Sequence, residues 1–100
     1  MATKIFVNLP VKDLNKSKEF FTSLGYSFNP QFTDDKAGCL VISEDIYFML
    51  LVEPYFKEFT SKEIADTSKV NEAIICLSAD SKEEVDTLSD KAVKAGAKEP

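Results

Sequence analysis

The sequence contains no histidine among its 100 residues. Imidazole is both a common metal ligand and the usual acid-base group near neutral pH. A site of imidazole ligands, including the two-histidine, one-carboxylate arrangement that supports iron and dioxygen chemistry, therefore cannot be assembled from this chain or from copies of it. Acid-base catalysis by histidine is excluded for the same reason.

Long apolar runs, basic clusters and flexible linkers are also missing. The longest apolar run, residues 46–52, is much shorter than the roughly 20 residues that cross a bilayer, and the N-terminus lacks a signal-peptide apolar region. Lys and Glu are interspersed and the net charge is -5, which disfavours nucleic acid as a partner. We expect one soluble, cytoplasmic domain with no membrane or nucleic-acid partner.

Cysteine is scarce, and the two cysteines, Cys39 and Cys76, form no C-x-x-C motif. Each lies within an apolar run that has the character of a strand. The sequence therefore predicts buried thiols in a reducing compartment. A disulfide between them is the less favoured alternative.

The clearest pattern in the chain is a strand, a corner and a helix at residues 5–26. Residues 4–9 alternate between two sets, the period-two signature of a strand with two different faces, and Pro10 ends that strand. Asp13 is placed to cap the following helix, and Gly25 is placed to end it in the left-handed region. The apolar stripe of this helix consists of Leu14, Phe21 and Leu24, with Phe20 at its flank.

Three further strands are predicted after this helix. The first covers residues 26–33, with Pro30 at an edge or a bulge. The turn at residues 34–38 contains two adjacent carboxylates, which suit a solvated turn better than the alternative of a calcium site. The strands at residues 39–43 and 46–52 follow, and the second of these is apolar on both faces, so we expect it at the centre of the sheet.

The last third of the chain is predicted to begin a second unit. Residues 54–70 break the strand pattern and are interpreted as a linker with about one helical turn. Alternation returns at residues 71–78, which predicts a strand. Ser81 and Glu84 then form a capping box for a helix that Gly96 ends.

The stretch at residues 5–26 resembles the first module of the vicinal oxygen chelate superfamily, which includes glyoxalases, extradiol dioxygenases and bleomycin resistance proteins. The resemblance lies in the order and spacing of a strand followed by the motifs V-K-D-L, S-x-x-F-[FY] and L-G-[YF]. Residues 72–97 resemble the opening strand and helix of the paired second module. The matching residues of the first module are Val11, Lys12, Asp13, Leu14, Ser17, Phe20, Phe21, Leu24, Gly25 and Tyr26.

The resemblance implies an α+β fold of βαβββ modules with a curved mixed sheet. Residues 1–53 would be the first module, residues 54–70 a linker, and residues 71–100 the start of a second, incomplete module of one glyoxalase-like domain. A sheet edge left open by that incomplete module invites pairing with another copy. We therefore expect a homodimer, with exchange of elements between protomers as one route to it.

The same resemblance locates the positions where family members hold a metal ion. The first-strand ligand position falls on Phe6, which cannot ligate a metal, and its counterpart in the second module falls near Ala73. Glu53, at the end of the last strand of the first module, and Glu72 are the weak candidates that are left. We therefore expect no metal or other cofactor, and a divalent metal only if ligands come from outside this chain.

A pocket on the curved sheet is the alternative to a metal centre. Phe6 and Asn8 are expected to face into it, joined either by some of Tyr47, Met49 and Leu51 or by Phe48 and Leu50. Aromatic residues of the linker are candidates for a lid. Filling of the core by the same side chains is the competing interpretation. The predicted pocket residues are Phe6, Asn8, Tyr47, Met49, Leu51, Phe56 and Phe59.

Three functions follow from these patterns. The first is binding of an apolar or aromatic small molecule in the cleft of the curved sheet without a catalytic metal, similar to the bleomycin resistance branch. The second is a metal-dependent lyase or dioxygenase whose ligands lie partly outside this chain. The third is a structural or interaction module whose pocket has filled with side chains. Phe6 at a ligand position favours the first and the third over the second, and the catalytic residues of any reaction stay unassigned.

Overall fold

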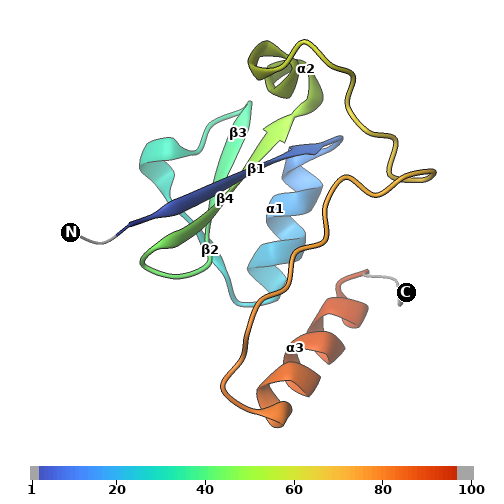
Figure 1. Ribbon diagram of the computed structural model, residues 1–100. Helices are drawn as coiled ribbons and strands as arrows, with labels where there is room; N and C mark the ends of the chain where they lie inside the picture. The colour runs from blue at the N-terminus through green and yellow to red at the C-terminus, as the bar shows by residue number, and fades with distance from the viewer. Residues whose placement is uncertain (1–2, 97–100) are drawn as a thin grey trace.

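The computed structural model describes residues 3–96, which form an α+β fold around one four-stranded mixed sheet in the order β1-β4-β3-β2 (Figure 1). Its strands are β1 (Ile5–Val11), β2 (Ser27–Phe28), β3 (Ala37–Val41) and β4 (Ile46–Val52). Its helices are α1 (Leu14–Ser23), α2 (Glu53–Phe56) and α3 (Lys82–Lys94), with short 3₁₀ turns η1 (Pro30–Phe32) and η2 (Lys57–Phe59). The predicted βαβββ module is confirmed.

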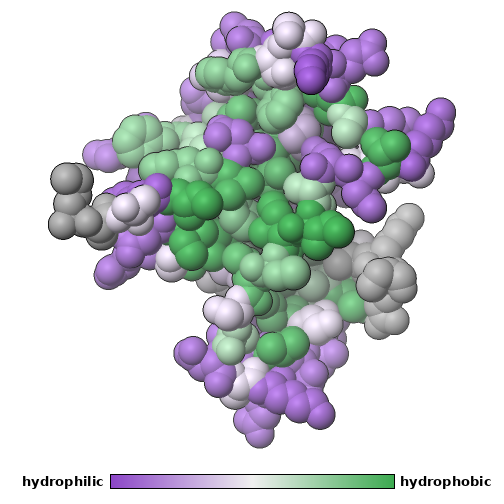
Figure 2. Space-filling model, viewed as in Figure 1, coloured by the Kyte–Doolittle hydropathy of each residue, from purple (hydrophilic) through white to green (hydrophobic). Residues whose placement is uncertain are grey.

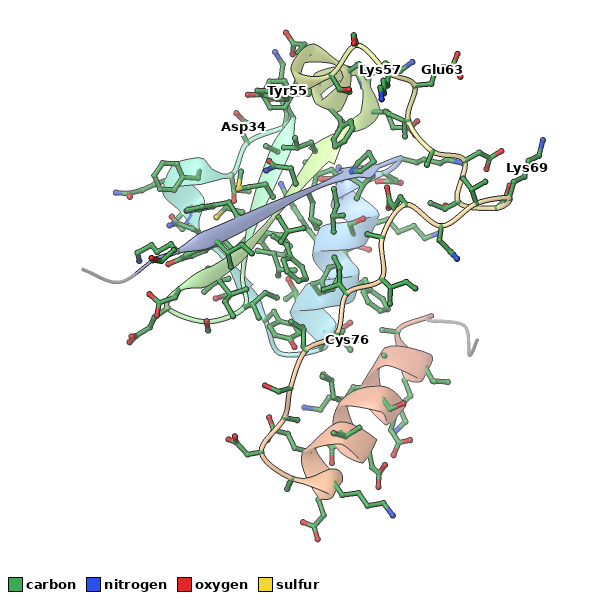
Figure 3. All side chains as sticks on the ribbon, viewed as in Figure 1. Asp34, Tyr55, Lys57, Glu63, Lys69 and Cys76 are labelled. Carbon is green, nitrogen blue, oxygen red and sulfur yellow. The ribbon has the colours of Figure 1, made fainter. Side chains whose placement is uncertain are left out.

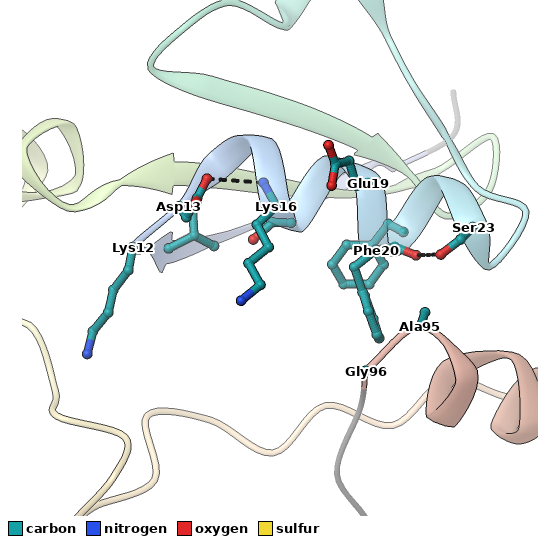
Figure 4. A pocket seen from close by; sticks show the side chains of 11 residues that line it. Lys12, Asp13, Lys16, Glu19, Phe20, Ser23, Ala95 and Gly96 are labelled. Atoms are coloured by element: carbon teal, nitrogen blue, oxygen red, sulfur yellow. Dashed lines mark hydrogen bonds between the residues drawn. The ribbon is translucent and has the colours of Figure 1, made fainter.

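The corner between β1 and α1 forms as the sequence predicts. The Asp13 carboxylate accepts a hydrogen bond of 3.1 Å from the Lys16 amide, which satisfies one of the free amides of the first turn (Figure 4). Gly25 follows α1 with a φ of 98°, the left-handed conformation that glycine adopts without strain. The chain thereby leaves the sheet after β1, runs over one face of the sheet as α1, and re-enters the sheet at β2.

β4 lies at the centre of the sheet, which confirms the prediction from its apolar faces. It pairs in parallel with β1 and antiparallel with β3. A parallel pair needs a crossover between its strands, and α1 belongs to this crossover and packs on one face of the sheet. β1 has a strand partner on one side only, so its other edge is open within residues 3–96.

The hydrophobic core lies between α1 and the sheet. Leu40 has no exposed surface, and it forms one cluster with Leu14, Phe48 and Leu50. Burial of an aliphatic side chain of this size stabilises the fold by about 1.5–3 kcal/mol. Half-buried residues that pack around the cluster include Val7, Leu9, Val11, Phe21, Tyr26 and Phe28.

The strand predicted at residues 26–33 is much shorter in the structure, where only Ser27–Phe28 pairs with β3. Pro30 has no amide hydrogen for the ladder and begins η1 instead. The Asn29 side chain caps this turn by accepting a hydrogen bond of 3.0 Å from the Gln31 amide. The edge position of the strand is confirmed, and its length is corrected.

The strand predicted at residues 71–78 is not formed in the described part of the chain. The segment is irregular and exposed, although its sequence alternates as a strand does, because no neighbouring strand takes its backbone hydrogen bonds. Cys76 is consequently exposed, which corrects the prediction of a buried thiol, whereas Cys39 is buried as predicted. Both cysteines are free.

The helix predicted after Ser81 is α3, and it begins at the predicted cap. The Ser81 hydroxyl accepts a hydrogen bond of 3.1 Å from the Glu84 amide, and the Glu84 carboxylate accepts one of 3.0 Å from the Asp80 amide. Gly96 follows the helix with a φ of 107°. None of the helices within residues 3–96 is long and apolar enough to span a bilayer.

Candidate functional site

The parallel register of β1 and β4 decides which side chains share the face of the sheet opposite α1, called here the open face. Phe6 pairs with Tyr47, Asn8 with Met49, and Pro10 with Leu51. Paired residues of neighbouring strands point to the same side. The residues of β4 on the open face are therefore Tyr47, Met49 and Leu51, whereas Phe48 and Leu50 lie in the core.

Figure 2 shows apolar side chains gathered across the middle of the molecule, over β1 and the chain segment that leads to α3. Phe6 is 51% exposed, and Ile5, its neighbour on the opposite face, is 52% exposed. Phe32 from η1 and Phe59 from η2 are also large exposed apolar side chains. Exposed aromatic rings that gather at one face of a sheet are typical of a surface that binds a ligand or another protein.

One hollow on the open face, called here the Tyr47 hollow, has a volume of about 300 Å³. The Phe6 and Tyr47 rings stack beside it, with centroids 4.9 Å apart and planes inclined by 12°. Its lining residues are Lys4, Phe6, Asn29, Phe32, Cys39 and Tyr47. This volume is at the lower end of the range for small-molecule sites and suits a ligand of one or two rings.

A single backbone carbonyl holds the polar groups at one end of the Tyr47 hollow. The carbonyl of Glu44 accepts hydrogen bonds from the Tyr47 hydroxyl at 2.8 Å and from the Lys4 ammonium at 3.1 Å. The Lys4 nitrogen also lies 5.5 Å from the centroid of the Tyr47 ring, within range of a cation-π interaction. An ammonium has three donors, so two are free for another acceptor after the bond to Glu44.

Cys39 lies at the bottom of the Tyr47 hollow with 1% of its surface exposed. Burial raises the pKa of its thiol, because the apolar surroundings disfavour the thiolate. The neutral thiol behaves as a small polarizable apolar group and suits contact with an aromatic ring. The sequence identified this cysteine as buried but did not place it in the pocket, because its face depends on the register with β4.

A second hollow of about 360 Å³, called here the Met49 hollow, lies nearer α2. Tyr55 and Phe59 form part of its lining, and their rings meet edge to face with centroids 5.2 Å apart. Phe32 lines this hollow and the Tyr47 hollow. The remaining lining residues are Asn8, Gln31, Thr33, Asp34, Ala37, Met49 and Leu51.

Asp34 supplies a carboxylate to the Met49 hollow, and Figure 3 shows it near Tyr55. One of its oxygens accepts hydrogen bonds from the amides of Lys36 at 2.8 Å and Ala37 at 3.0 Å. These bonds lower the pKa of the Asp34 carboxyl, because they stabilise its charged form. The carboxylate organises the turn before β3, which agrees with the predicted turn.

Six of the seven predicted pocket residues therefore line the two hollows on the open face. Phe6 and Tyr47 line the Tyr47 hollow, whereas Asn8, Met49, Leu51 and Phe59 line the Met49 hollow. Phe56 lies apart from both, in a groove of about 440 Å³ beside β1 that also contains Ile64 and Glu72. The Asn8 amide donates to the carbonyl of Phe6 at 3.3 Å, so part of its hydrogen-bonding capacity is already used.

The sequence interpretation missed Lys4, Asn29, Phe32 and Asp34 as lining residues, whereas Tyr55 is one of the linker aromatics that it gave as lid candidates. Most of them follow or precede strands, where the direction of a side chain depends on the turn that the chain makes. The alternation in residues 4–9 gave the only usable signal, since it places Lys4 on the same face as Phe6.

The predicted metal candidates do not come together in the structure. Glu53 begins α2 and is half-buried, whereas Glu72 is exposed in the irregular segment before α3. Within residues 3–96, no group of three or more His, Cys, Asp or Glu side chains is arranged to hold a metal ion. Phe6, at the expected ligand position, stacks on Tyr47 instead.

Two other hollows contain none of the predicted site residues. The larger, about 910 Å³, is an open depression beside α1 with Lys12, Lys16 and Phe20 in its lining, and Phe20 points toward Ala95 and Gly96 (Figure 4). The other, about 400 Å³, separates α1 from α3 and is largely apolar, with Phe21 and Leu88 among its lining residues. Neither brings together a set of groups with recognisable chemistry.

Comparison with known proteins agrees with this architecture. Residues 3–43, from the beginning of β1 to the end of β3, match the family model for the bleomycin resistance protein-like N-terminal region. The solved structure of hypothetical protein SA1046 from S. aureus is 32% identical and has a TM-score of 0.76, over 96% of this chain and 72% of that chain. No curated protein matches.

A βαβββ module with a curved, mixed sheet is the fold of the glyoxalase and bleomycin resistance superfamily. Together with the matching region and the similar structure, it identifies the class of protein predicted from the V-K-D-L, S-x-x-F-F and L-G-Y motifs. The chain belongs to the bleomycin resistance protein-like family.

Proposed function

We propose that this protein binds a small apolar or aromatic molecule on the open face of its sheet, without a catalytic metal. The observation that carries the proposal is the pairing of Phe6 with Tyr47 and of Asn8 with Met49. This register gathers rings, a thioether and an amide beside two hollows of about 300 and 360 Å³. Small-molecule sites commonly combine such apolar walls with a few polar groups.

Binding without a metal is part of the proposal. Phe6 occupies the position where metal-binding relatives are expected to have a ligand, and an aromatic hydrocarbon ring cannot coordinate a cation through a lone pair. Glu53 and Glu72 lie on different segments, and the described residues bring no third donor to them. Asn8 and Tyr47 are left to orient a ligand by hydrogen bonds.

The test uses 2-naphthamide, a neutral two-ring probe, and two matched variants. Phe6→Ala removes an aromatic wall of the Tyr47 hollow and is expected to weaken binding about tenfold, the effect of losing a stacked aromatic contact. Ile5→Ala removes an equally exposed side chain from the opposite face and is expected to leave the affinity within about twofold. Titration by ligand-observed NMR, with and without EDTA, gives the affinities.

Thermal unfolding of both variants separates loss of the pocket from loss of the fold. Phe6 and Ile5 are both half exposed, so each substitution is expected to lower the melting temperature by only a few degrees. Equal weakening by both variants, or loss of binding in EDTA, would contradict the proposal. Absence of binding by the unaltered protein would support a pocket filled by its own side chains.

We propose further that the protein acts as a homodimer in the cytoplasm. The exposed apolar residues Ile74, Ile75 and Leu77 and the open edge of β1 favour association, since isolated strands and apolar patches are costly in water. Exchange of residues 71–78 between copies would give that segment the strand partner it lacks within residues 3–96.

Sedimentation velocity tests the dimer. Ile74 is 84% exposed, so Ile74→Asp is expected to shift the protein towards monomer while its melting temperature at low concentration stays nearly unchanged. Ser61→Asp, which adds one negative charge at an exposed position outside the segment, is the control for added charge. A protein that sediments as a monomer up to about 100 μM, well above the Kd of a stable dimer, would contradict this proposal.

A further inference from the structure

We infer that the Tyr47 hollow selects an aromatic anion, with its ring between the Tyr47 and Phe32 side chains and its negative group at the Lys4 ammonium. This inference rests on the proposed function and names the class of ligand that the open face would take. It depends on three features of the hollow: its shape, the sign of its charge and the fixed position of Lys4.

The shape of the hollow suits a flat ring. Tyr47 from β4 and Phe32 from η1 line it from different elements, and the buried thiol of Cys39 on β3 also belongs to its lining. Phe6 stacks on Tyr47 and extends the aromatic wall towards β1. Aromatic walls favour another ring, and sulfur makes favourable contacts with ring edges.

The side chains that line the hollow carry one positive charge, although the protein carries a net charge of -5. Lys4 is the one ionised residue among the six that line it, since the buried Cys39 thiol is held neutral by its raised pKa. The carboxylate of Asp34 lines the Met49 hollow instead. Because salt screens exposed charges beyond about 8 Å, the distant charges that contribute to the net charge have little effect at the hollow.

The Lys4 ammonium is held in place before any ligand arrives. Its hydrogen bond to the carbonyl of Glu44 and its position over the Tyr47 ring restrict the long side chain. The same carbonyl accepts the Tyr47 hydroxyl bond, so the cation and the aromatic wall are positioned by one anchor. Restricting a lysine beforehand lowers the entropy cost of an ion pair with a ligand.

Three probes that share one ring system and differ in charge test the inference: 2-naphthoate, 2-naphthamide and 2-naphthylmethylammonium. We expect 2-naphthoate to bind about fivefold more tightly than 2-naphthamide, and the cation to bind most weakly. Lys4→Met keeps the apolar stem of the side chain and removes its charge, so it is expected to bring the ratio of the 2-naphthoate and 2-naphthamide affinities to about one. The preference should also shrink as NaCl is raised.

Lys62→Met is the matched control, because it makes the same change in net charge at an exposed position outside both hollows. It is expected to keep the preference for 2-naphthoate. Equal binding of all three probes, tightest binding of the cation, or an equal effect of the two lysine variants would overturn this inference and leave the proposed function standing. Absence of binding by all three probes would overturn both.

Discussion

Replacing Leu40 by alanine is expected to destabilise the protein by about 3–5 kcal/mol. Leu40 has no exposed surface and lies in the core cluster between α1 and the sheet with Leu14, Phe48 and Leu50. The substitution removes apolar contacts and leaves a cavity that the rigid strands on either side cannot fully close. For a domain of this size, the loss corresponds to a fall in melting temperature of about 12 °C or more.

Leu77→Ala is the matched control for Leu40→Ala, because it makes the same chemical change in the irregular segment before α3. Leu77 is 44% exposed in the single chain, so its truncation is expected to cost about 1 kcal/mol or less at protein concentrations low enough to keep the protein monomeric. Urea unfolding followed by circular dichroism gives both values. If Leu77→Ala were as costly as Leu40→Ala at these concentrations, residues 71–78 would be packed within the monomer, which would contradict the exposed segment seen here.

Replacing Gly38 by valine is expected to cost about 2–3 kcal/mol by overpacking the core. Gly38 lies on β3 opposite Leu50, and a Cβ atom there would be 3.1 Å from Phe28 Cε2 and 3.3 Å from Leu14 Cδ1. Both neighbours are held in the core, so they can move only by disturbing their own contacts. Gly38→Ala, which adds one methyl group, is expected to cost about 1 kcal/mol.

A second glycine distinguishes crowding from backbone strain. At Gly25, a Cβ atom would meet nothing within 4 Å, but the φ of 98° is unfavourable for any other residue. Gly25→Ala and Gly25→Leu are therefore expected to cost about the same, roughly 1–2 kcal/mol, whereas the cost at Gly38 should rise with the size of the side chain. Urea unfolding measures each variant.

The pair of Gly38→Val and Phe28→Leu supplies the decisive check for crowding. Phe28→Leu shortens the side chain that lies nearest to the added atoms. The double variant is therefore expected to lose less unfolding free energy than the two single variants lose together. Strict additivity would mean that Phe28 does not limit the space at Gly38.

Local features of the fold could be predicted from the sequence because their causes lie within a few residues. The Asp13 cap, the Gly25 stop and the Ser81 cap each depend on one side chain and the turn next to it. The central position of β4 followed from its apolar residues on both faces, which only a buried strand tolerates.

The strand predictions failed where a partner decides the outcome. Residues 26–33 and residues 71–78 both alternate as strands, yet the first is cut short at Pro30 and the second has no strand beside it within residues 3–96. Alternation shows which side chains would share a face, but a strand forms only when neighbouring backbone groups accept and donate its hydrogen bonds.

The sequence by itself determined the αβ module, its family and the absence of imidazole chemistry, because these depend on residue types and short spacings. Only the tertiary structure decided which face of β4 joins Phe6 and Asn8, since the parallel register arises from a crossover of more than thirty residues. The same register brought Lys4, Cys39 and Phe32 to one hollow. Their distance along the chain gives no local signal, and only the packing of the strands and of η1 places them together.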